Sequence, residues 1–555
     1  MMILMCKHKS ELDSCIQLKN CELCRVRFIW LLGLIMVASC HHQESTSEHV
    51  VFHYNQHNNI TSLDPAFAKS QNNIWAANHL YNTLLVLDDS LQVCPSLAKS
   101  WEVSEDARTY TFTIRDKITF HRDPSLGDRR RFLTATDVEY SFNRLVDTTV
   151  NSPGSWIFAD RIAGEKPFEA INDTTFILRL KEPFSPTLSL LTMQYASIIP
   201  KEAVAYYGVD FYKHPVGTGP FRMKRWLSNQ GLFLERNPDY FDWQGHPKNN
   251  LEGVRTSFIG ERSFAFLELV NQRIDFFSGL ESSFIHTALD EKGQLKEIYK
   301  NRIKFSKSPY LNFEYLGINQ TAEDAHPLLK EKSFRQALNY GIDREVMLAT
   351  LRKNIGVPAD AGVIPRGLPS YNPTYVNGYA YNPSKARDLL AYLDQSLLDI
   401  PLVIHTSKDY LDLTTFIAKQ WENIGLKTKI EVSESAILRN AMRTGIVGMF
   451  RASWIADYPD GENFLSMFYS SNPAPPNYTR YHNDNFDNLY RNALSNADEE
   501  DRIRLYYQMD SMLVDDAPVI FLFYDEISQF SNNKISGLST NALNLLHVTD
   551  IHKGI

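Results

Sequence analysis

The sequence is short of cysteine, of long apolar stretches and of runs of like charge. Six cysteines in 555 residues are too few for a disulfide scaffold. Acidic residues outnumber basic ones, 65 against 57, and no long basic run exists, which argues against dedicated nucleic-acid binding. Repeats and low-complexity tracts are missing too. With 43% apolar and 22% charged residues, the composition is that of an ordinary globular protein, with roughly three domains or one large multi-lobed body.

One apolar stretch suggests how the protein is targeted. Phe28 to Ala38 follows Arg25 and Arg27, and its eleven residues are too few to cross a bilayer as a helix. A basic segment, an apolar segment of this length and then small residues are typical of a secretory signal peptide. Residues 1–24 precede it without targeting character, which suggests a translation start assigned too early.

The end of this leader resembles the lipobox of bacterial lipoproteins, in which the leader is cut before a cysteine that is then acylated. Residues 37–40 read Val-Ala-Ser-Cys. We therefore predict a signal peptide over 1–39, a lipid anchor on Cys40 and a polar tether over 40–48; the alternative is an ordinary signal peptide with Cys40 free. Cys94 is the only later cysteine, so the mature chain has no intramolecular disulfide.

Strand and helix patterns alternate along the rest of the chain and predict a mixed α/β fold. Tyr110 to Ile114 and Phe176 to Leu180 alternate apolar and polar residues, as half-buried strands do. Val519 to Tyr524 is a continuous apolar run, typical of a strand buried on both faces. Asn382-Pro383 predicts a helix start, and the spacing of apolar residues over 503–513 predicts a second helix.

No catalytic motif is found in the sequence. The Gly-x-Ser-x-Gly nucleophile elbow and the zincin helix pattern are both absent. The turn Gly217-Thr218-Gly219-Pro220 lacks the third glycine of a dinucleotide loop and the lysine of a phosphate loop, so we interpret it as structural. His41-His42 lies on the tether, and His405, Asp409 and Asp412 are more typical of a solvated face than of a metal site. A missing motif does not prove a missing activity, but it makes a secreted enzyme a weaker candidate. Our prediction is a protein that is not an enzyme and that carries no cofactor and no metal.

Several further segments occur in the order that is found in one family. The segments are Thr61-Ser62-Leu63-Asp64-Pro65-Ala66, 95–106 (PSLAKSWEVSED), 110–115 (YTFTIR), 136–142 (TDVEYSF), 215–221 (PVGTGPF), 334–344 (FRQALNYGIDR) and 454–460 (WIADYPD). Together they resemble bacterial extracellular solute-binding protein family 5, the oligopeptide and dipeptide receptors of ABC importers, from about residue 50 to the C-terminus. Each alone is weak, but this many in order is a strong resemblance.

The resemblance implies a two-lobed clamp of the periplasmic-binding-protein type II, with mixed α/β lobes and the ligand enclosed between them. Lobe I would comprise 49–80, 206–305 and 525–555, with an extra subdomain over 81–205. Lobe II would span 306–524. The family also implies a monomer anchored in the cell envelope, facing the periplasm, with an ABC permease as partner.

The family's Trp-x-Ala-Asp segment supplies the first candidate site residues. Its aspartate neutralises the N-terminal ammonium of a bound peptide, and here that residue is Asp457. A buried ammonium needs such a carboxylate, because an uncompensated charge costs several kcal/mol. Trp454 would form an aromatic wall over the first ligand residues. Arg451 matches an arginine that some members use toward the ligand's carboxylate; a salt bridge within the lobe is the alternative.

Two further candidates depart from the family pattern. Trp156 lies where the family often places a ligand-facing tyrosine. After Thr406-Ser407, where certain oligopeptide receptors have a histidine, this chain has Asp409-Tyr410, so Tyr410 is a candidate and the length of the ligand stays open. A short peptide is the predicted ligand. The alternatives are another nutrient of the family, such as a metal chelate, haem, sugar or opine, or else an envelope hydrolase or an assembly scaffold.

Overall fold

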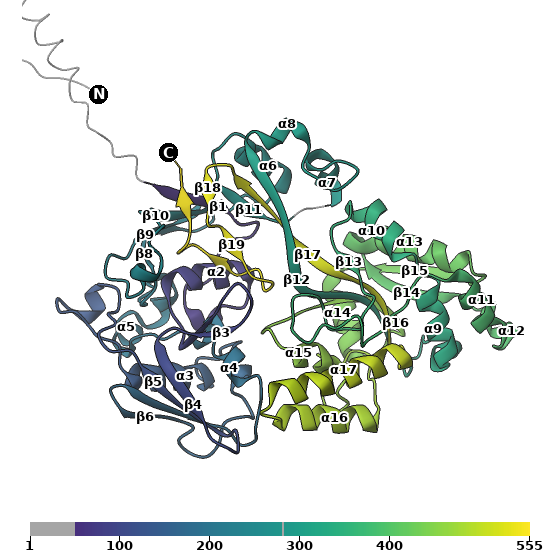
Figure 1. The fold of residues 1–555 in the computed structure, drawn as a ribbon, viewed down its shortest axis with the longest axis horizontal. Helices are drawn as coiled ribbons and strands as arrows, with labels where there is room; N and C mark the ends of the chain where they lie inside the picture. Colours follow the sequence, from purple (N-terminus) through teal and green to yellow (C-terminus); the bar gives the residue numbers. More distant parts are fainter. Residues whose placement is uncertain (1–49, 280–281, 555) are drawn as a thin grey trace, which may run out of the picture. The chain divides into compact units, whose positions relative to one another are not determined.

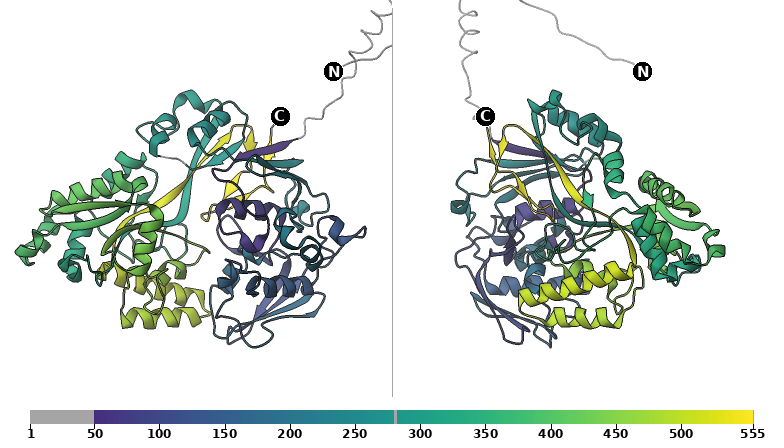
Figure 2. Two further views of the ribbon diagram at one scale, coloured as in Figure 1. Left: turned by 180° about the vertical axis from the view of Figure 1, so that it is seen from behind. Right: turned by 45° about the vertical axis from the view of Figure 1, so that its right-hand side comes forward.

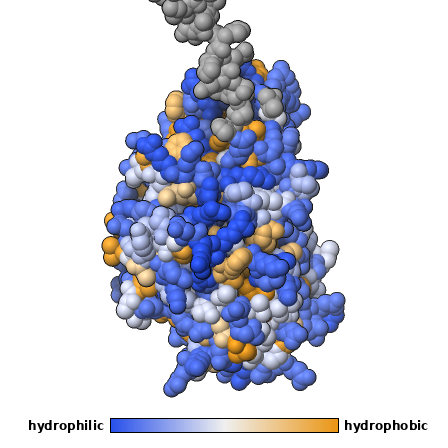
Figure 3. All heavy atoms as spheres, turned by 90° about the vertical axis from the view of Figure 1, so that its left-hand side faces the viewer, coloured by the Kyte–Doolittle hydropathy of each residue, from blue (hydrophilic) through white to orange (hydrophobic). Residues whose placement is uncertain are grey.

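The computed structural model describes residues 50–279 and 282–554 of the chain (Figure 1). The predicted signal peptide, the anchor on Cys40 and the tether over 40–48 lie outside the described residues. Within the described ranges, no helix is long and apolar enough to cross a membrane. On the face shown in Figure 3, hydrophilic residues cover most of the surface and hydrophobic residues form only small groups.

An eleven-stranded mixed sheet is the centre of the fold. Its strands follow the order β15-β14-β16-β12-β17-β11-β1-β10-β9-β8, and β13 pairs with β17 off this path. The strands are β1 (Val51–Asn55), β8 (Phe221–Leu227), β9 (Gly231–Arg236), β10 (Gly253–Ser257), β11 (Phe276–Ser278), β12 (Ile303–Ile318), β13 (Val357–Pro358), β14 (Leu402–Ser407), β15 (Thr428–Ser433), β16 (Met449–Ile455) and β17 (Val519–Asn532). The long antiparallel pair β12 and β17 runs side by side through both halves of this sheet (Figures 1 and 2).

Smaller sheets and helices complete the described chain. The other strands are β2 (Leu85–Leu87), β3 (Val93–Pro95), β4 (Ala98–Val103), β5 (Thr109–Ile114), β6 (Phe168–Asn172), β7 (Thr175–Arg179), β18 (Ile535–Ser536), β19 (Ser539–Thr540), β20 (Leu546–His547) and β21 (His552–Lys553). The α-helices are α2 (Gln71–Leu80), α3 (Ala135–Val146), α4 (Thr187–Leu190), α5 (Lys201–Tyr207), α6 (Arg262–Val270), α7 (Ser282–Ala288), α8 (Glu297–Lys300), α9 (Lys332–Tyr340), α10 (Arg344–Arg352), α11 (Pro383–Ala391), α12 (Gln395–Leu398), α13 (Leu411–Glu422), α14 (Ser435–Thr444), α15 (Glu462–Leu465), α16 (Asp484–Ser495) and α17 (Glu499–Asp516).

The first half of the main sheet forms a core around β1. This strand lies between β10 and β11, parallel to both, and its alternation buries Phe52 and Tyr54 completely. Trp75 of α2 meets the Tyr54 ring edge-on, at 5.7 Å between centroids. The turn that contains Gly217 lies against the end of α2, where a Cβ at Gly217 would come 2.2 Å from the Leu80 carbonyl oxygen. Glycine is therefore needed there for close packing, consistent with the structural interpretation of this turn.

A four-stranded antiparallel sheet, in the order β4-β5-β7-β6, forms a separate layer. Both strands predicted in this region exist, as β5 and β7, with Phe112 opposite Phe176. Phe142 of α3 packs edge-on against Phe176, at 5.4 Å between ring centroids. Aromatic residues on the inward face of the sheet thus bind it to α3, as the alternating pattern predicted.

The second half of the main sheet also contains the elements predicted for it. Asn382 caps α11 by accepting a hydrogen bond from the Lys385 amide at 3.0 Å. The predicted helix over 503–513 lies within α17. The predicted strand is the start of β17, which continues to Asn532 because it passes into the other half of the sheet.

Two arginines of the segment 334–344 donate hydrogen bonds to backbone carbonyl oxygens and so have a structural role. The Arg344 guanidinium is buried and donates hydrogen bonds to the carbonyl oxygens of Phe521 and Tyr379, among others. Burial lowers the pKa of Arg344 to about 10. Arg335, also buried, donates to four carbonyl oxygens, those of Leu329, Lys330, Asp516 and Ala517. The two arginines therefore join α9 and the turn after it to β17 and to the residues just before that strand.

The pairing of β12 with β17 has two register shifts, one between Pro309 and Phe313 and one between Glu314 and Tyr315, and the first is the larger. Pro309 pairs with Glu526 and pairing resumes at Phe313 with Tyr524, so three residues of β12 oppose one of β17. Such a bulge bends the strand. We place the hinge between the lobes at this interruption, near the two boundaries predicted for lobe II; the division of the chain into lobes and subdomain stays a proposal.

Candidate ligand-binding site

Four neighbouring cavities share lining residues. We name them the Asp457 cavity (about 330 Å³, with Trp75, Tyr195 and Asp457), the aromatic cavity (about 840 Å³, with Trp156, Trp454 and Tyr469), the hinge cavity (about 350 Å³, with Tyr310, Glu314 and Tyr410) and the amide cavity (about 820 Å³, with Asn55, Asn72 and Arg262). Asp457 lines the first two, Tyr310 joins the first to the hinge cavity, and Trp75 joins it to the amide cavity. Volumes of this size suit small organic ligands.

Asp457 lies two residues beyond Ile455, the last residue of β16, where the chain leaves the sheet. The preceding residue, Ala456, still donates its amide to the Leu311 carbonyl oxygen on β12, at 2.8 Å. The Asp457 side chain is exposed toward the cavities, and no described residue hydrogen-bonds to or forms an ion pair with its carboxylate. The surrounding protein nevertheless removes enough water to raise the pKa of Asp457 from 3.8 to about 6. An uncompensated carboxylate in such a place is suited to a cationic ligand group.

Tyr195 lies close to this carboxylate. Burial, and to a smaller extent the charge of Asp457, raises the pKa of Tyr195 to about 12. Its ring packs against Gly154, where a Cβ would come 2.2 Å from the ring. Tyr195 thus forms a neutral aromatic wall opposite Asp457.

Trp454 and Trp156 line the aromatic cavity together with Asp457. The Trp454 indole donates to the side-chain oxygen of Asn463 at 2.9 Å, and the same oxygen accepts the backbone amide of Asp457 at 3.3 Å. Asn463 therefore fixes both residues. Trp156 tilts against Tyr458, at 6.3 Å between ring centroids. The structure thus brings three of the five predicted site residues together.

The buried carboxylate of Glu462, which lines the aromatic cavity, supports the turn that contains Asp457. Glu462 accepts hydrogen bonds from the hydroxyl groups of Tyr458 and Tyr490, and burial raises its pKa. Asp460 accepts the hydroxyl of Tyr506 at 2.8 Å. These bonds hold the 457–462 turn against the helices that follow it.

Tyr410 lines the hinge cavity and Arg451 packs against its ring, apart from the other three candidates. Arg451 forms an ion pair with Glu314, and the side chains are only 10% and 5% exposed. The guanidinium carbon lies 3.0 Å from the centre of the Tyr410 ring. Tyr410 and Glu314 line the cavity. A role of Arg451 toward a ligand carboxylate stays a prediction, and its charge already has a partner within the same half of the sheet.

Sequence reasoning missed the residues that complete the walls. Trp75, Tyr195, Tyr310 and Asn544 all line the Asp457 cavity. They come from distant parts of the chain and belong to no motif, so no local signal could identify them. Among the described residues, no group of three His, Cys, Asp or Glu side chains is placed to hold a metal ion.

The sequence matches a known family over most of its length. Residues 92–476 match the family described as bacterial extracellular solute-binding proteins, family 5 Middle. The probable D,D-dipeptide-binding periplasmic protein DdpA of Escherichia coli K12 is 26% identical over 498 residues, which cover 87% of this chain and 90% of the relative. The periplasmic oligopeptide-binding protein OppA of Salmonella typhimurium is 26% identical over 506 residues, which cover 85% of this chain and 86% of the relative.

Solved structures agree with the predicted fold. The Helicobacter pylori ABC transporter-associated periplasmic binding protein DppA, in complex with the peptide STSA, is 25% identical and superposes with a TM-score of 0.72, covering 91% of this chain and 99% of that one. HbpA2 from Haemophilus parasuis is 23% identical and superposes with a TM-score of 0.79, covering 91% of this chain and 100% of that one. At this identity the likeness supports the fold alone. The predicted two-lobed mixed α/β class is therefore confirmed.

Proposed function

The chain belongs to the bacterial extracellular solute-binding proteins of family 5, and we propose that it is the receptor of an ABC importer, enclosing a short peptide between its lobes and delivering it to a membrane permease. The relatives described above as binding dipeptides and oligopeptides support a peptide ligand. The proposed role is binding without catalysis, on the periplasmic side of the envelope.

The observation that carries this proposal is the carboxylate of Asp457, which has no partner among the described residues. The free N-terminus of a peptide is an ammonium group, and Asp457 offers it a charge-assisted hydrogen bond beside cavity walls that already raise the pKa of this carboxyl to about 6. The adjoining aromatic cavity, about 840 Å³ in volume, leaves room for a ligand side chain with bridging water. Hydrogen bonds to the main chain of an extended peptide would supply further affinity without selecting for the peptide's side chains.

Native mass spectrometry of gently purified protein tests the proposal. We expect a series of co-purified masses that matches a mixture of short peptides. One discrete non-peptide compound would contradict a peptide receptor, and would favour another nutrient of the family. A protein that carries nothing and binds no added peptide would contradict a receptor altogether.

The pKa of Asp457 predicts how peptide affinity depends on pH. The ligand ammonium favours the ionised carboxylate, so binding lowers the pKa of Asp457 from its value of about 6 in the free protein. Affinity should therefore be greatest above pH 6 and fall by up to about tenfold per unit as the pH drops below it. Calorimetric titration between pH 4.5 and 7.5 measures this. Asp457→Asn should remove the dependence, and an unchanged pH profile in that variant would contradict the assignment.

We further propose that Cys40 is lipidated and anchors the receptor in a membrane. The proposal rests on the lipobox-like segment over 37–40. Cys40→Ser should leave the precursor unprocessed or the protein in the aqueous phase of a detergent partition, because the acyl chains can no longer be attached. Metabolic labelling with a palmitate analogue checks this. A native mature protein that is unlabelled and begins elsewhere than at Cys40 would overturn it.

A further inference from the structure

The amide cavity differs in charge from the other three cavities of the site. Its described lining residues include the basic side chains of Arg262 and Lys69 and no Asp or Glu. Seven carboxamide side chains also line it, namely Asn55, Gln56, Asn58, Asn59, Gln71, Asn72 and Asn73. The aromatic cavity, by contrast, includes Asp160, Glu182 and Glu462 besides Asp457. The neighbouring cavities thus differ in charge, with acidic side chains at the aromatic cavity and basic side chains at the amide cavity.

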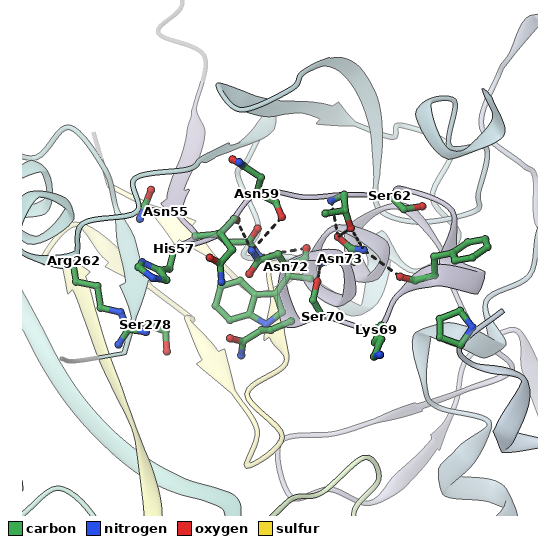
Figure 4. Close-up of a pocket in the computed structure, with 17 residues that line it drawn as sticks. Asn55, His57, Asn59, Ser62, Lys69, Ser70, Asn72, Asn73, Arg262 and Ser278 are labelled. Atoms are coloured by element: carbon green, nitrogen blue, oxygen red, sulfur yellow. Dashed lines mark hydrogen bonds between the residues drawn. The ribbon is translucent and has the colours of Figure 1, made fainter. Parts of the chain in front are cut away.

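The carboxamides build the wall of the amide cavity rather than provide its charge. Asn73 donates to the hydroxyl oxygen of Thr61 at 3.0 Å and to the Phe67 carbonyl oxygen at 3.1 Å (Figure 4). Asn72 donates to the Asn58 carbonyl oxygen. These bonds hold the loop after β1 against α2. They give the wall a fixed shape and leave recognition of a charged ligand group to the two cations.

The Arg262 guanidinium has no partner among the residues that the structure describes. Arg262 is the first residue of α6 and lies at one end of the cavity beside Ser278 (Figure 4). Among the described residues it has no ion pair or hydrogen bond, and its Nε is buried without an acceptor. A Cβ at Gly279 would lie 3.1 Å from its Nη1, so the guanidinium packs closely on the backbone there. Leaving such donors unsatisfied is costly, and an anion in the cavity would satisfy them.

The other arginine that lines the hinge cavity is already neutralised, because Arg352 pairs with Asp525. Arg262 lines both the hinge cavity and the amide cavity. Of these two guanidinium groups, Arg262 is therefore the one that has no counter-charge among the described residues and whose charge is available to a ligand.

We propose that the amide cavity binds the carboxylate end of the ligand, with Arg262 as its main partner and Lys69 as a second positive charge. This inference rests on the proposed peptide-binding function and adds to it. Asp457 binds the ammonium end of the ligand, and Lys69, Gln71 and Trp75 line both cavities and connect them. The site therefore selects peptides with a free carboxylate over peptides whose C-terminus is an amide.

Arg262→Gln tests the proposal, with alanine peptides of two to five residues that end in a free carboxylate or an amide. Calorimetry should show that the wild type prefers the carboxylate form at least tenfold and that Arg262→Gln loses this preference. Both proteins should bind the amides equally. Arg273→Gln, which removes an exposed arginine just beyond the other end of α6, is the matched control and should behave as wild type. Thermal unfolding should be unchanged in Arg262→Gln, because this guanidinium has no described partner to lose.

The outcomes separate this inference from the function on which it rests. If the wild type binds free peptides but does not distinguish carboxylate from amide, the carboxylate site is wrong while the peptide receptor stands. The same conclusion follows if Arg262→Gln keeps the full preference. If the wild type, stripped of bound ligand, binds none of the peptides, the proposed function itself fails.

Discussion

Replacing Asp457 by asparagine should weaken peptide binding by about 2–5 kcal/mol, or roughly thirtyfold to several thousandfold in Kd. The substitution keeps the shape of the side chain and removes the one charge that the described part of the site offers to a ligand ammonium at this place. Asn463 holds the Asp457 backbone amide and the Trp454 indole, so the wall around the variant side chain should remain in place. Isothermal calorimetry on protein stripped of bound ligand measures the loss.

Asp160→Asn is the matched control for this variant. Asp160 also lines the aromatic cavity, and its left-handed backbone conformation (φ 61°) suits asparagine as well as aspartate. It removes the same charge from the same cavity without touching the proposed ammonium partner, so its affinity should stay within about twofold of wild type. Equal losses in the two variants would indicate a general effect of charge and would contradict a specific contact by Asp457.

Glu314→Gln should lower the free energy of unfolding by about 3–5 kcal/mol, because it leaves the Arg451 charge buried without a counter-charge. Adding Arg451→Gln should recover most of this loss, since the second substitution removes the uncompensated charge. Urea unfolding of the wild type, both single variants and the double variant measures this. If Glu314→Gln costs less than about 1 kcal/mol, the ion pair does not have the buried character that the structure gives it.

The secondary structure of this chain was predictable where the pattern is local. The alternating residues of β5 and β7 and the Asn382 cap of α11 each lie within a few consecutive residues. The length of β17 was not predictable, because a continuous apolar run does not show that a strand passes from one half of a sheet into the other. The bulge of β12 between Pro309 and Phe313 has no sequence signal either, because it is defined only by the pairing of β12 with β17.

In the candidate site, too, local features were predictable and contacts between distant parts of the chain were not. Trp454 and Asp457 lie in one short segment, so their proximity could be predicted together with their type. The pairing of Arg451 with Glu314 depends on the register between β16 and β12, in which Arg451 faces Leu316 and Ser453 faces Glu314. That register is set by pairing between strands more than a hundred residues apart. That Arg262 has no partner among the described residues is likewise visible only in the folded structure.

The most direct test of the central claim compares one peptide with and without an acetyl group on its N-terminus. If Asp457 binds the ligand ammonium, acetylation should weaken binding to the wild type, freed of co-purified ligand, by about 2–5 kcal/mol. This loss should be comparable to that in Asp457→Asn. The two losses should not add when the acetylated peptide is titrated into the variant, because both remove one interaction. Equal affinity of the wild type for the free and the acetylated peptide would contradict the account.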